Sequence, residues 1–259
     1  MERHDPATRD EAIALLRRGL SNRAVAERLD VPRGTIGWWL SEDRRKRGAR
    51  FERPTDCPRC TRRPLDAEAY AYLLGLYLGD GHITSRAKQH HLSIFCTASR
   101  PALVDAAEEA MRRVMPGPNV RRRFRRGCAE VKSYTRHWTC LFPQHGPGRK
   151  HAREISLETW QQEVVDAHPW EFVRGLLHSD GCRTTNWTTR VVNGERRRYE
   201  YPRYWFTNVS DDIRRLYTDT LDKLGVSWTH CTRAGKPYNI SVARRASVAL
   251  LDAHVGPKD

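Results

Sequence analysis

Apolar residues recur at helical spacing near the start of the chain and predict three short helices. The first helix ends at Gly19, the second follows Ser21 as its N-cap, and the third covers residues 33–40. The third helix is expected to present three side chains outward: Arg33, Thr35 and Trp38. The pattern therefore predicts a small all-α unit.

Three helices joined by a glycine-led turn and a second short turn are typical of a helix-turn-helix, whose last helix enters the DNA major groove. The run resembles the helix-turn-helix of transposase and resolvase type. We assign residues 1–42 to this domain; the alternative is a small structural three-helix cap. Residues 43–65 are highly charged with little apolar periodicity, and predict a basic linker able to lie along phosphates.

The remainder of the chain shows one order of helical and strand-like patterns twice. Residues 66–168 give a helix, a strand pair, an amphipathic helix, a hairpin around Gly127 and a further helix. Residues 169–259 repeat that order, with a long hairpin turning at Asn193-Gly194. This duplication predicts an α+β fold of two pseudo-symmetric αββαββα repeats.

Each repeat opens with an apolar helix that ends in Asp-Gly. Residues 73–81 read Leu-Leu-Gly-Leu-Tyr-Leu-Gly-Asp-Gly, and residues 173–181 read Val-Arg-Gly-Leu-Leu-His-Ser-Asp-Gly. An aspartate in the last turn of a helix meets the negative end of the macrodipole, so a positive charge must compensate it. A divalent cation shared by Asp80 and Asp180 would supply that charge.

The charge of the chain indicates a polyanionic partner. The sequence has 46 Lys and Arg against 31 Asp and Glu, a net charge of +15, with 39% hydrophobic residues. The positive charge is clustered, at residues 44–50, 121–126 and 196–198, which favours nucleic acid over a surface adapted for solubility. No signal peptide or long apolar span is evident, so we expect a cytoplasmic protein of prokaryotic or phage origin with no membrane partner.

Seven cysteines, an odd number, do not predict a disulfide framework. Cys57-Pro58-Arg59-Cys60 has the spacing of half a zinc site, and a structural zinc needs four ligands. We nominate Cys140 and His145 as the other two ligands, with three alternatives: Cys128, His137 and His151. Two buried thiols without a metal are the competing interpretation.

The two motifs and the repeated order make residues 66–259 resemble the LAGLIDADG homing endonucleases in their single-chain, two-motif form. The resemblance implies that the two motif helices pack together at a pseudo-two-fold axis. Four small residues match the places where these helices approach each other: Gly75, Gly79, Gly175 and Ser179. Leu78 and His178 stand where the namesake motif has its first aspartate, a place that varies in the family.

The resemblance also implies a metal centre. Asp80 and Asp180 match the family's metal ligands, and with the backbone carbonyls of Gly79 and Ser179 they are expected to hold two or three Mg²⁺ ions. By position we nominate basic residues near the metals as further catalytic residues: Lys150 in the first half, Arg244 or Arg245 in the second, and His82 and Arg183 as nearby contributors.

A DNA-binding saddle of two antiparallel sheets follows from the same resemblance, in a monomer that acts as a pseudo-dimer on double-stranded DNA. Alternate side chains of such strands contact base edges and phosphates in the major groove. The candidates are Arg121, Arg123, Arg125, Lys132, Arg190, Arg196, Arg198, Arg203 and Asn208.

The expected function is site-specific double-strand DNA cleavage by a metal-dependent endonuclease. The main alternative is a DNA-binding transcriptional regulator that kept the LAGLIDADG fold without cleavage, as the bacterial sporulation regulators with a helix-turn-helix have done. Retention of both aspartates favours cleavage. An RNA splicing maturase is a further alternative, whereas the ends of this sequence lack the residues that protein splicing requires.

Overall fold

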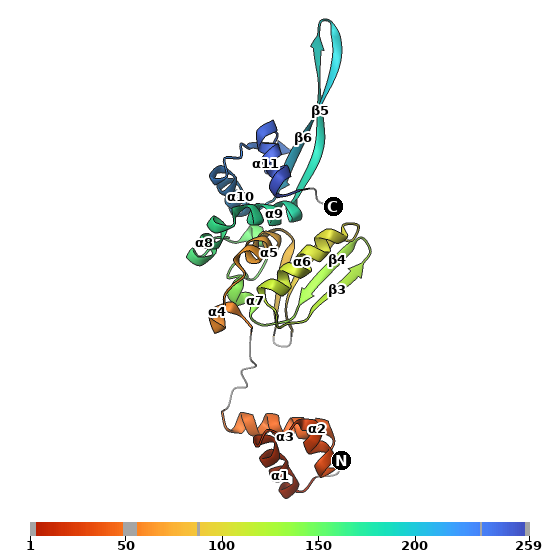
Figure 1. Ribbon diagram of the computed structural model, residues 1–259, viewed down its shortest axis with the longest axis vertical. Coiled ribbons are helices and arrows are strands. Elements are labelled where there is room, and N and C mark those ends of the chain that lie inside the picture. The colour runs from red at the N-terminus through yellow and green to blue at the C-terminus, as the bar shows by residue number, and fades with distance from the viewer. Residues whose placement is uncertain (1–3, 49–55, 87–88, 234, 257–259) are drawn as a thin grey trace. The chain divides into compact units, whose positions relative to one another are not determined.

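The computed structural model describes residues 4–48, 56–86, 89–233 and 235–256, and the chain divides into two compact units, residues 1–54 and 55–259 (Figure 1). Each unit is described by itself. No helix within the described residues is both long enough and apolar enough to cross a bilayer.

Unit 1 consists of three helices around its own apolar core. They are α1 (Pro6–Arg17), α2 (Asn22–Leu29) and α3 (Arg33–Lys46). Six buried side chains form the core: Ala12, Leu15, Val25, Val31, Ile36 and Trp39. The Ser21 hydroxyl accepts a hydrogen bond from Ala24 N at 3.2 Å, so it caps α2 as predicted. The three-helix prediction is confirmed, and its role in DNA binding remains a prediction.

Helix α3 continues to Lys46, beyond the boundary at residue 42 that the sequence predicted. Asp43 explains the extension, because its carboxylate pairs with Arg17 of α1 and with Arg47, both at 2.7 Å. The Arg17 pair holds the second half of α3 on α1, and the Arg47 pair stabilises the end of α3 itself. Residues 43–46 therefore belong to the helix and not to the linker, and residues 49–55 of the predicted linker lie outside the described residues.

Unit 2 contains the two predicted repeats. The first half comprises α4 (Pro58–Thr61), α5 (Ala67–Asp80), β1 (Gly81–Arg86), β2 (Gln89–Thr97), α6 (Pro101–Val114), β3 (Val120–Arg125), β4 (Cys128–Ser133), α7 (Trp138–Leu141), the 3₁₀ turn η1 (Lys150–Ala152) and α8 (Thr159–Ala167). The second half comprises α9 (Pro169–Asp180), β5 (Gly181–Val192), β6 (Glu195–Thr207), α10 (Asp211–Lys223), β7 (Thr229–Arg233), β8 (Lys236–Val242) and α11 (Arg245–His254).

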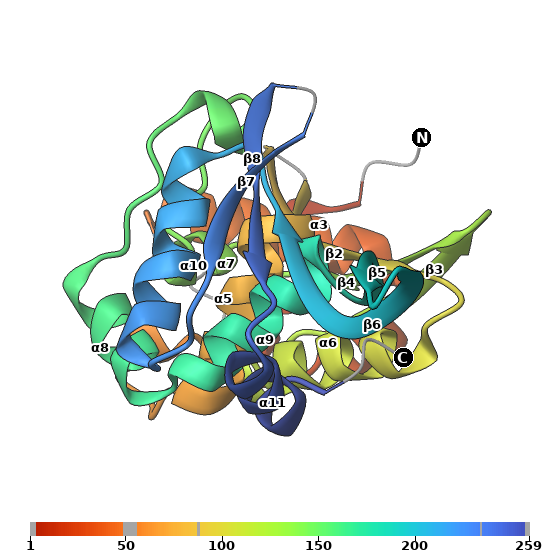
Figure 2. The ribbon, with the colours of Figure 1, turned by 90° about the horizontal axis from the view of Figure 1, so that it is seen from above.

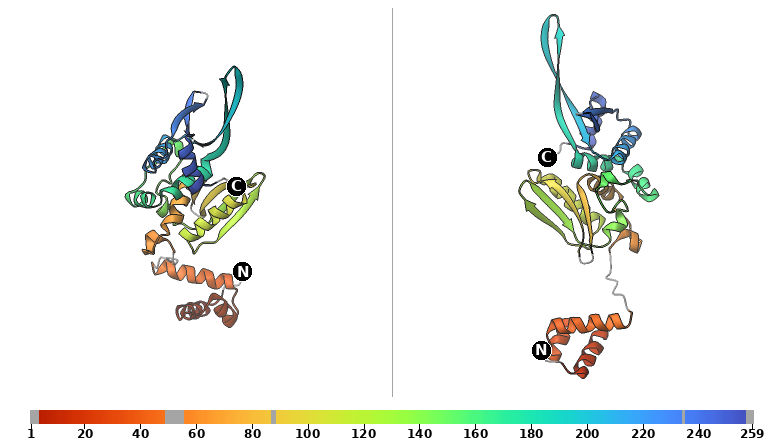
Figure 3. Two further views of the ribbon diagram at one scale, coloured as in Figure 1. Left: turned by 45° about the horizontal axis from the view of Figure 1, so that its top comes forward. Right: turned by 180° about the vertical axis from the view of Figure 1, so that it is seen from behind.

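Each half forms one four-stranded antiparallel sheet, in the order β1-β2-β4-β3 and the matching order β5-β6-β8-β7. Helix α6 packs on one face of the first sheet (Figure 1), and the other face of that sheet is turned to the viewer in the right view of Figure 3. Helix α10 lies beside β7 and β8 in Figure 2. One apolar core runs through both halves, and every residue of α5 from Ala69 to Leu78 is buried in it. This central position explains why α5 is apolar on all sides.

The hairpin between β5 and β6 projects beyond the rest of its sheet (Figure 1). It turns at Asn193 and Gly194, whose φ angles of 54° and 83° are both positive, as a two-residue type I′ turn requires. The predicted turn is confirmed. Because β8 pairs with β6 only over Tyr204–Thr207, the outer part of the hairpin is a two-stranded ribbon.

Candidate metal and nucleic-acid site

Helices α5 and α9 pack so closely that their backbones touch. A Cβ atom added to Gly175 would lie 2.2 Å from the Tyr72 carbonyl oxygen, and one added to Gly75 would lie 2.5 Å from the Phe172 carbonyl oxygen. Glycine is required at both positions because any side chain would separate the helices. The Tyr72 hydroxyl also lies 3.0 Å from Nδ1 of His178, a polar contact across the same interface.

The close packing brings the two motif aspartates together. A Cβ atom added to Gly79 would lie 2.9 Å from Oδ2 of Asp180, so the carboxylate of α9 lies against the last turn of α5. Asp80 and Asp180 are both half-buried at the carboxyl ends of their helices. Ser179 turns its hydroxyl back to its own helix, donating to the carbonyl of Leu176 at 2.9 Å.

Lys150 reaches the same point from the loop after α7. Its Nζ donates to the carbonyls of Leu78 at 3.0 Å and Gly79 at 3.1 Å, and also to that of Tyr77. Burial lowers the pKa of this ammonium to about 8, although the negative charges of Asp180 and Asp80 oppose the shift. The lysine nominated from the sequence thus supplies positive charge at the end of α5, where the macrodipole is negative.

Arg153 shapes the loop that carries Lys150. Its guanidinium donates to the carbonyls of Gln144 at 2.9 Å, Gly146 at 3.1 Å and Gly148 at 2.9 Å. These loop carbonyls lie outside any sheet or helix, so the arginine supplies hydrogen bonds that secondary structure does not. Sequence reasoning missed Arg153, since its only local signal is a basic residue close to two glycines.

In the second half an amide contacts the carboxylate of Asp180. Asn208, directly after β6, donates from Nδ2 to Oδ2 of Asp180 at 2.6 Å, and its own Oδ1 accepts from Ser210 N at 2.8 Å. This residue was expected on the DNA-binding surface. Its position at a strand end that faces a motif helix was the available signal for its contact with Asp180.

The basic residues nominated for the second half lie elsewhere. Arg244 is the N-cap residue of α11 and donates to the Ser227 hydroxyl at 3.3 Å, and Arg245 begins that helix. Arg183 pairs with Asp252 of α11 at 2.7 Å. It faces the helices because it pairs with the buried Tyr204 in register, and paired residues share a face.

His82, nominated as a contributor, does lie near the lysine. It follows the motif directly on β1, and partial burial together with the positive charges of Lys150 and Arg153 lowers its pKa. A neutral imidazole is therefore favoured beside the ammonium group.

The donor set at the two helix ends suits a hard divalent cation. Two carboxylates and the negative ends of two helices converge on one point, and oxygen ligands of this kind are those that Mg²⁺ and Ca²⁺ prefer. The carbonyl of Gly79, predicted as a ligand, is hydrogen-bonded by Lys150 here.

The register of the first sheet places a row of polar side chains on the face opposite α6. Arg121 pairs with Lys132, Lys132 with Ser93, and Ser93 with His82, so these four residues share that face. Arg123 and Arg125 lie on it too, because they alternate with Arg122. Arg122 instead faces α6, where it pairs with Glu108 and with Asp105. The alternation expected for β3 is thus confirmed.

The second sheet divides its nominated arginines between two faces. Arg203 pairs with Thr184. Side chains of a strand alternate between its two faces, and Arg190 lies an even number of residues after Thr184 on β5, so it shares their face. Arg196 and Arg198 lie on the opposite face of the ribbon. Arg198 stacks over Trp187 with its guanidinium carbon 4.9 Å from the ring centroid, and pairs with Glu200 at 2.6 Å.

In unit 1, α3 presents the nominated residues outward. Arg33 is exposed, Thr35 is half-buried, and Trp38 is 60% exposed. The neighbouring Trp39 is buried in the core of this unit, so the two tryptophans point to different sides of α3.

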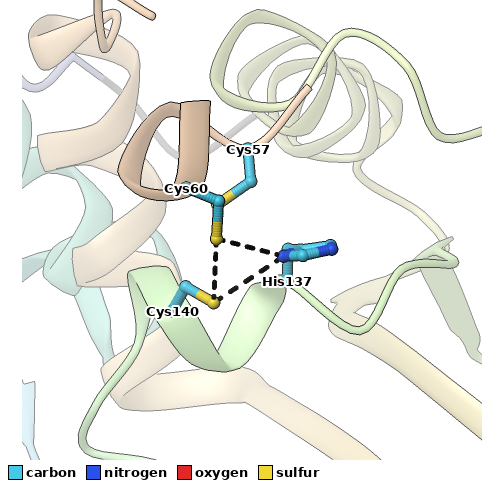
Figure 4. Close-up of side chains that lie close together, drawn as sticks. All are labelled: Cys57, Cys60, His137 and Cys140. Carbon is cyan, nitrogen blue, oxygen red and sulfur yellow. Dashed lines mark hydrogen bonds between the residues drawn. The ribbon is translucent and has the colours of Figure 1, made fainter. Parts of the chain in front are cut away.

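The predicted zinc ligands come together with one change. Cys57, Cys60 and Cys140 cluster as predicted, but the histidine beside them is His137 and not His145 (Figure 4). His137 is the N-cap residue of α7, one turn before Cys140, so both point to one side. His145 follows Pro143 beyond that helix. Burial, together with the nearby positive charge of Arg153, lowers the pKa of its imidazole.

Comparison with known proteins is limited to structure, because no family model and no curated protein matches this sequence. The structure of I-DmoI in complex with DNA and Mn aligns with a TM-score of 0.50 at 12% identity, covering 73% of this chain and 97% of that chain. I-WcaI bound to its DNA recognition sequence gives 0.48 at 13%, covering 76% and 84%. The N-terminal LAGLIDADG domain of DUF199/WhiA gives 0.47 at 9%, covering 79% and 88%.

At this identity the I-DmoI likeness concerns the fold alone. The two matching sheets, the order of elements and the two central glycine-contacting helices agree with it. The second unit of the chain therefore has the LAGLIDADG fold, the two-repeat α+β architecture that it shares with the I-DmoI structure.

Proposed function

We propose that this chain is a site-specific endonuclease that cleaves double-stranded DNA with divalent metal ions held by Asp80 and Asp180. The observation that carries the proposal is the convergence of both carboxylates with the buried ammonium of Lys150 at the ends of α5 and α9. A fold kept only for binding needs neither carboxylate at this half-buried and electrostatically unfavourable place.

Mg²⁺ bound there would activate water and stabilise the oxygen that leaves phosphorus. The chain's own groups position the ligands and balance charge. Asn208 fixes one oxygen of Asp180, and Lys150 holds positive charge beside the carboxylates. Its buried ammonium stabilises negative charge that develops on a phosphate more strongly than it would in water.

DNA would lie on the sheet faces that carry the basic rows. The first sheet offers Arg121, Arg123, Arg125 and Lys132 on one face. Because both aspartates come from one chain, a monomer suffices for two cleavage events. The neighbouring I-DmoI structure, described as a complex with DNA and Mn, supports this use of the fold.

A regulator that binds DNA without cutting is the second candidate, favoured by the separate three-helix unit with Trp38 exposed. It uses the same DNA surfaces and makes the two aspartates dispensable. The two functions therefore differ in one measurable property, which is Mg²⁺-dependent cleavage.

The deciding experiment compares the full chain with the double variant Asp80→Asn plus Asp180→Asn on a plasmid library carrying randomised or host-derived sites. We expect Mg²⁺-dependent cuts by the wild type, and binding of the selected site without cutting by the double variant. Asp219→Asn, an exposed aspartate of α10, is the matched control and should cut normally. Binding without cutting by the wild type on every selected site would establish the regulator instead.

A further inference from the structure

We propose that Cys57, Cys60, His137 and Cys140 form a structural zinc site that fastens the start of the LAGLIDADG unit to the segment after β4. Their four ligand atoms lie within 4.8 Å of one another. Four protein ligands of this type close a tetrahedral site, which is the arrangement of structural rather than catalytic zinc.

The distances agree with a tetrahedron. Sγ of Cys60 lies 3.7 Å from Sγ of Cys140, and Nδ1 of His137 lies 3.3 Å and 3.8 Å from these two sulfurs. A tetrahedron with Zn–S bonds of about 2.3 Å and Zn–N bonds of about 2.0 Å has sulfur–sulfur edges of about 3.8 Å and sulfur–nitrogen edges of about 3.5 Å. The side chains need little movement to hold the ion.

The backbone positions the four ligands as two pairs, and both pairs have the same local geometry. Cys57 and Cys60 stand three residues apart on one helical turn, with Cys60 N donating to Cys57 O at 3.1 Å. His137 and Cys140 repeat this geometry, with Cys140 N donating to His137 O at 3.0 Å. Figure 4 shows the two short helices facing each other across the four side chains. Residues three positions apart on a helical turn lie on the same side of it, so both ligands of each pair point in one direction.

Packing contributes little to the stability of α4 in its observed position. The helix has four residues, and of its segment only Cys57 and Pro58 are buried, while Arg59, Cys60 and Thr61 are exposed. A single helical turn is unstable in water without tertiary support. On its outer side Arg59 stacks over Trp160 of α8 at 4.5 Å, which leaves the cysteine side facing α7.

The three thiolates and the imidazole determine which metal ion the site prefers. Soft sulfur ligands in a tetrahedral arrangement favour Zn²⁺ and disfavour the Mg²⁺ expected at the aspartates. The two sites therefore use different ions, and the zinc proposal does not depend on whether the chain cleaves DNA.

The first test measures metal content in the purified full-length chain by elemental mass spectrometry. We expect about one zinc per chain in the wild type, falling below about one tenth in His137→Ala. His137→Cys retains a ligand at the same position and should keep the zinc, so a loss in both variants would count against residue 137 as a zinc ligand.

Two matched controls change residues of the same types outside the cluster. His145→Ala and Cys128→Ser should retain full zinc content, since neither residue belongs to the four. Replacement of zinc by Co²⁺ in the wild type should give the visible absorption of tetrahedral cobalt with sulfur-to-metal charge transfer, and this readout needs no variant.

Wild-type protein without zinc, or with zinc undiminished in His137→Ala, would overturn the proposal. A disulfide between Cys60 and Cys140, detected by mass spectrometry of protein purified with a reductant, would overturn it as well. Failure in these measurements leaves the endonuclease proposal untouched, because that proposal is tested by cleavage in the aspartate variants.

Discussion

At the scale of single residues, Lys150 lies where several negative charges meet. The carbonyl end of α5, Asp80 and Asp180 surround its ammonium group, and burial still lowers the pKa to about 8. The ammonium group thus loses part of its hydration, and the helix carbonyls together with the two carboxylates offset that cost.

We expect Lys150→Met to reduce the cleavage rate by about 10²-fold or more, since it removes a charge that acts on the phosphate during reaction. Affinity for the site should change much less. Single-turnover cleavage and equilibrium binding separate the two effects. Arg149→Met alters the exposed neighbouring residue and serves as the control. Equal losses of cleavage rate and of affinity would show that Lys150 acts only as a phosphate contact in binding.

Gly175 carries a steric prediction. In an ordinary helix, replacing glycine by alanine stabilises the protein by up to about 1 kcal/mol. Here the added Cβ would lie 2.2 Å from a backbone oxygen, so Gly175→Ala should instead destabilise the protein by about 1–3 kcal/mol. Denaturant unfolding measures the sign directly.

Gly146→Ala is the matched control, because its added Cβ would lie 3.5 Å from the flexible side chain of Arg153. We expect it to unfold close to the wild-type midpoint. Stabilisation by Gly175→Ala would mean that the two motif helices are farther apart in solution.

At the scale of elements, local chemistry made some features predictable from the sequence. The Asn193-Gly194 turn and the N-cap at Ser21 depend on residues next to each other in the chain, and both predictions are confirmed. The resemblance to the LAGLIDADG family predicted the central pairing of α5 and α9, and the glycine at the same place in both helices lies where their backbones touch.

Two kinds of prediction were less accurate: which face of a strand a side chain occupies, and which residues a distant loop brings to a site. Arg183 was expected near the metals, yet one step along a strand turns a side chain to the other face, where it meets Asp252. His137 replaced His145 in the cysteine cluster because the short helix α7 determines which side chains face α4. No local pattern predicted that helix.

The β5–β6 ribbon gives an element-scale prediction. Its outer part carries arginines on both faces and two exposed aromatic residues, Trp187 and Tyr199, which suits a ribbon that lies along a nucleic-acid groove. Changing its four outer arginines to glutamine should weaken DNA binding and make it less sensitive to salt. The four are Arg190, Arg196, Arg197 and Arg198.

The slope of log affinity against log salt should fall by about 0.9 for each phosphate contact removed. Fluorescence anisotropy at several salt concentrations measures this slope. Arg112→Gln plus Arg215→Gln, on α6 and α10, provides the control, because those arginines pair with acidic residues of their own helices. An unchanged slope in the ribbon variant would exclude phosphate contacts by the ribbon.

At the scale of the whole molecule, the three-helix unit and the two motif aspartates belong to different compact units of the chain. Unit 1 has its own core of six residues, and the carboxylates lie in unit 2. A unit with an independent core keeps its fold when its surface is changed, so substitutions on α3 test its function without disturbing Asp80 and Asp180.

We expect Arg33→Gln plus Thr35→Ala to weaken binding of the cleavage site by about tenfold or more, because such residues of a third helix contact bases or phosphates. The single-turnover cleavage rate at saturating protein should stay at the wild-type value, since Asp80, Asp180 and Lys150 are unchanged. Arg23→Gln, which removes an exposed arginine paired with Glu27 on α2, should leave affinity nearly unaltered. If affinity is also unchanged in the α3 variant, unit 1 is a structural cap and the sheets alone recognise DNA.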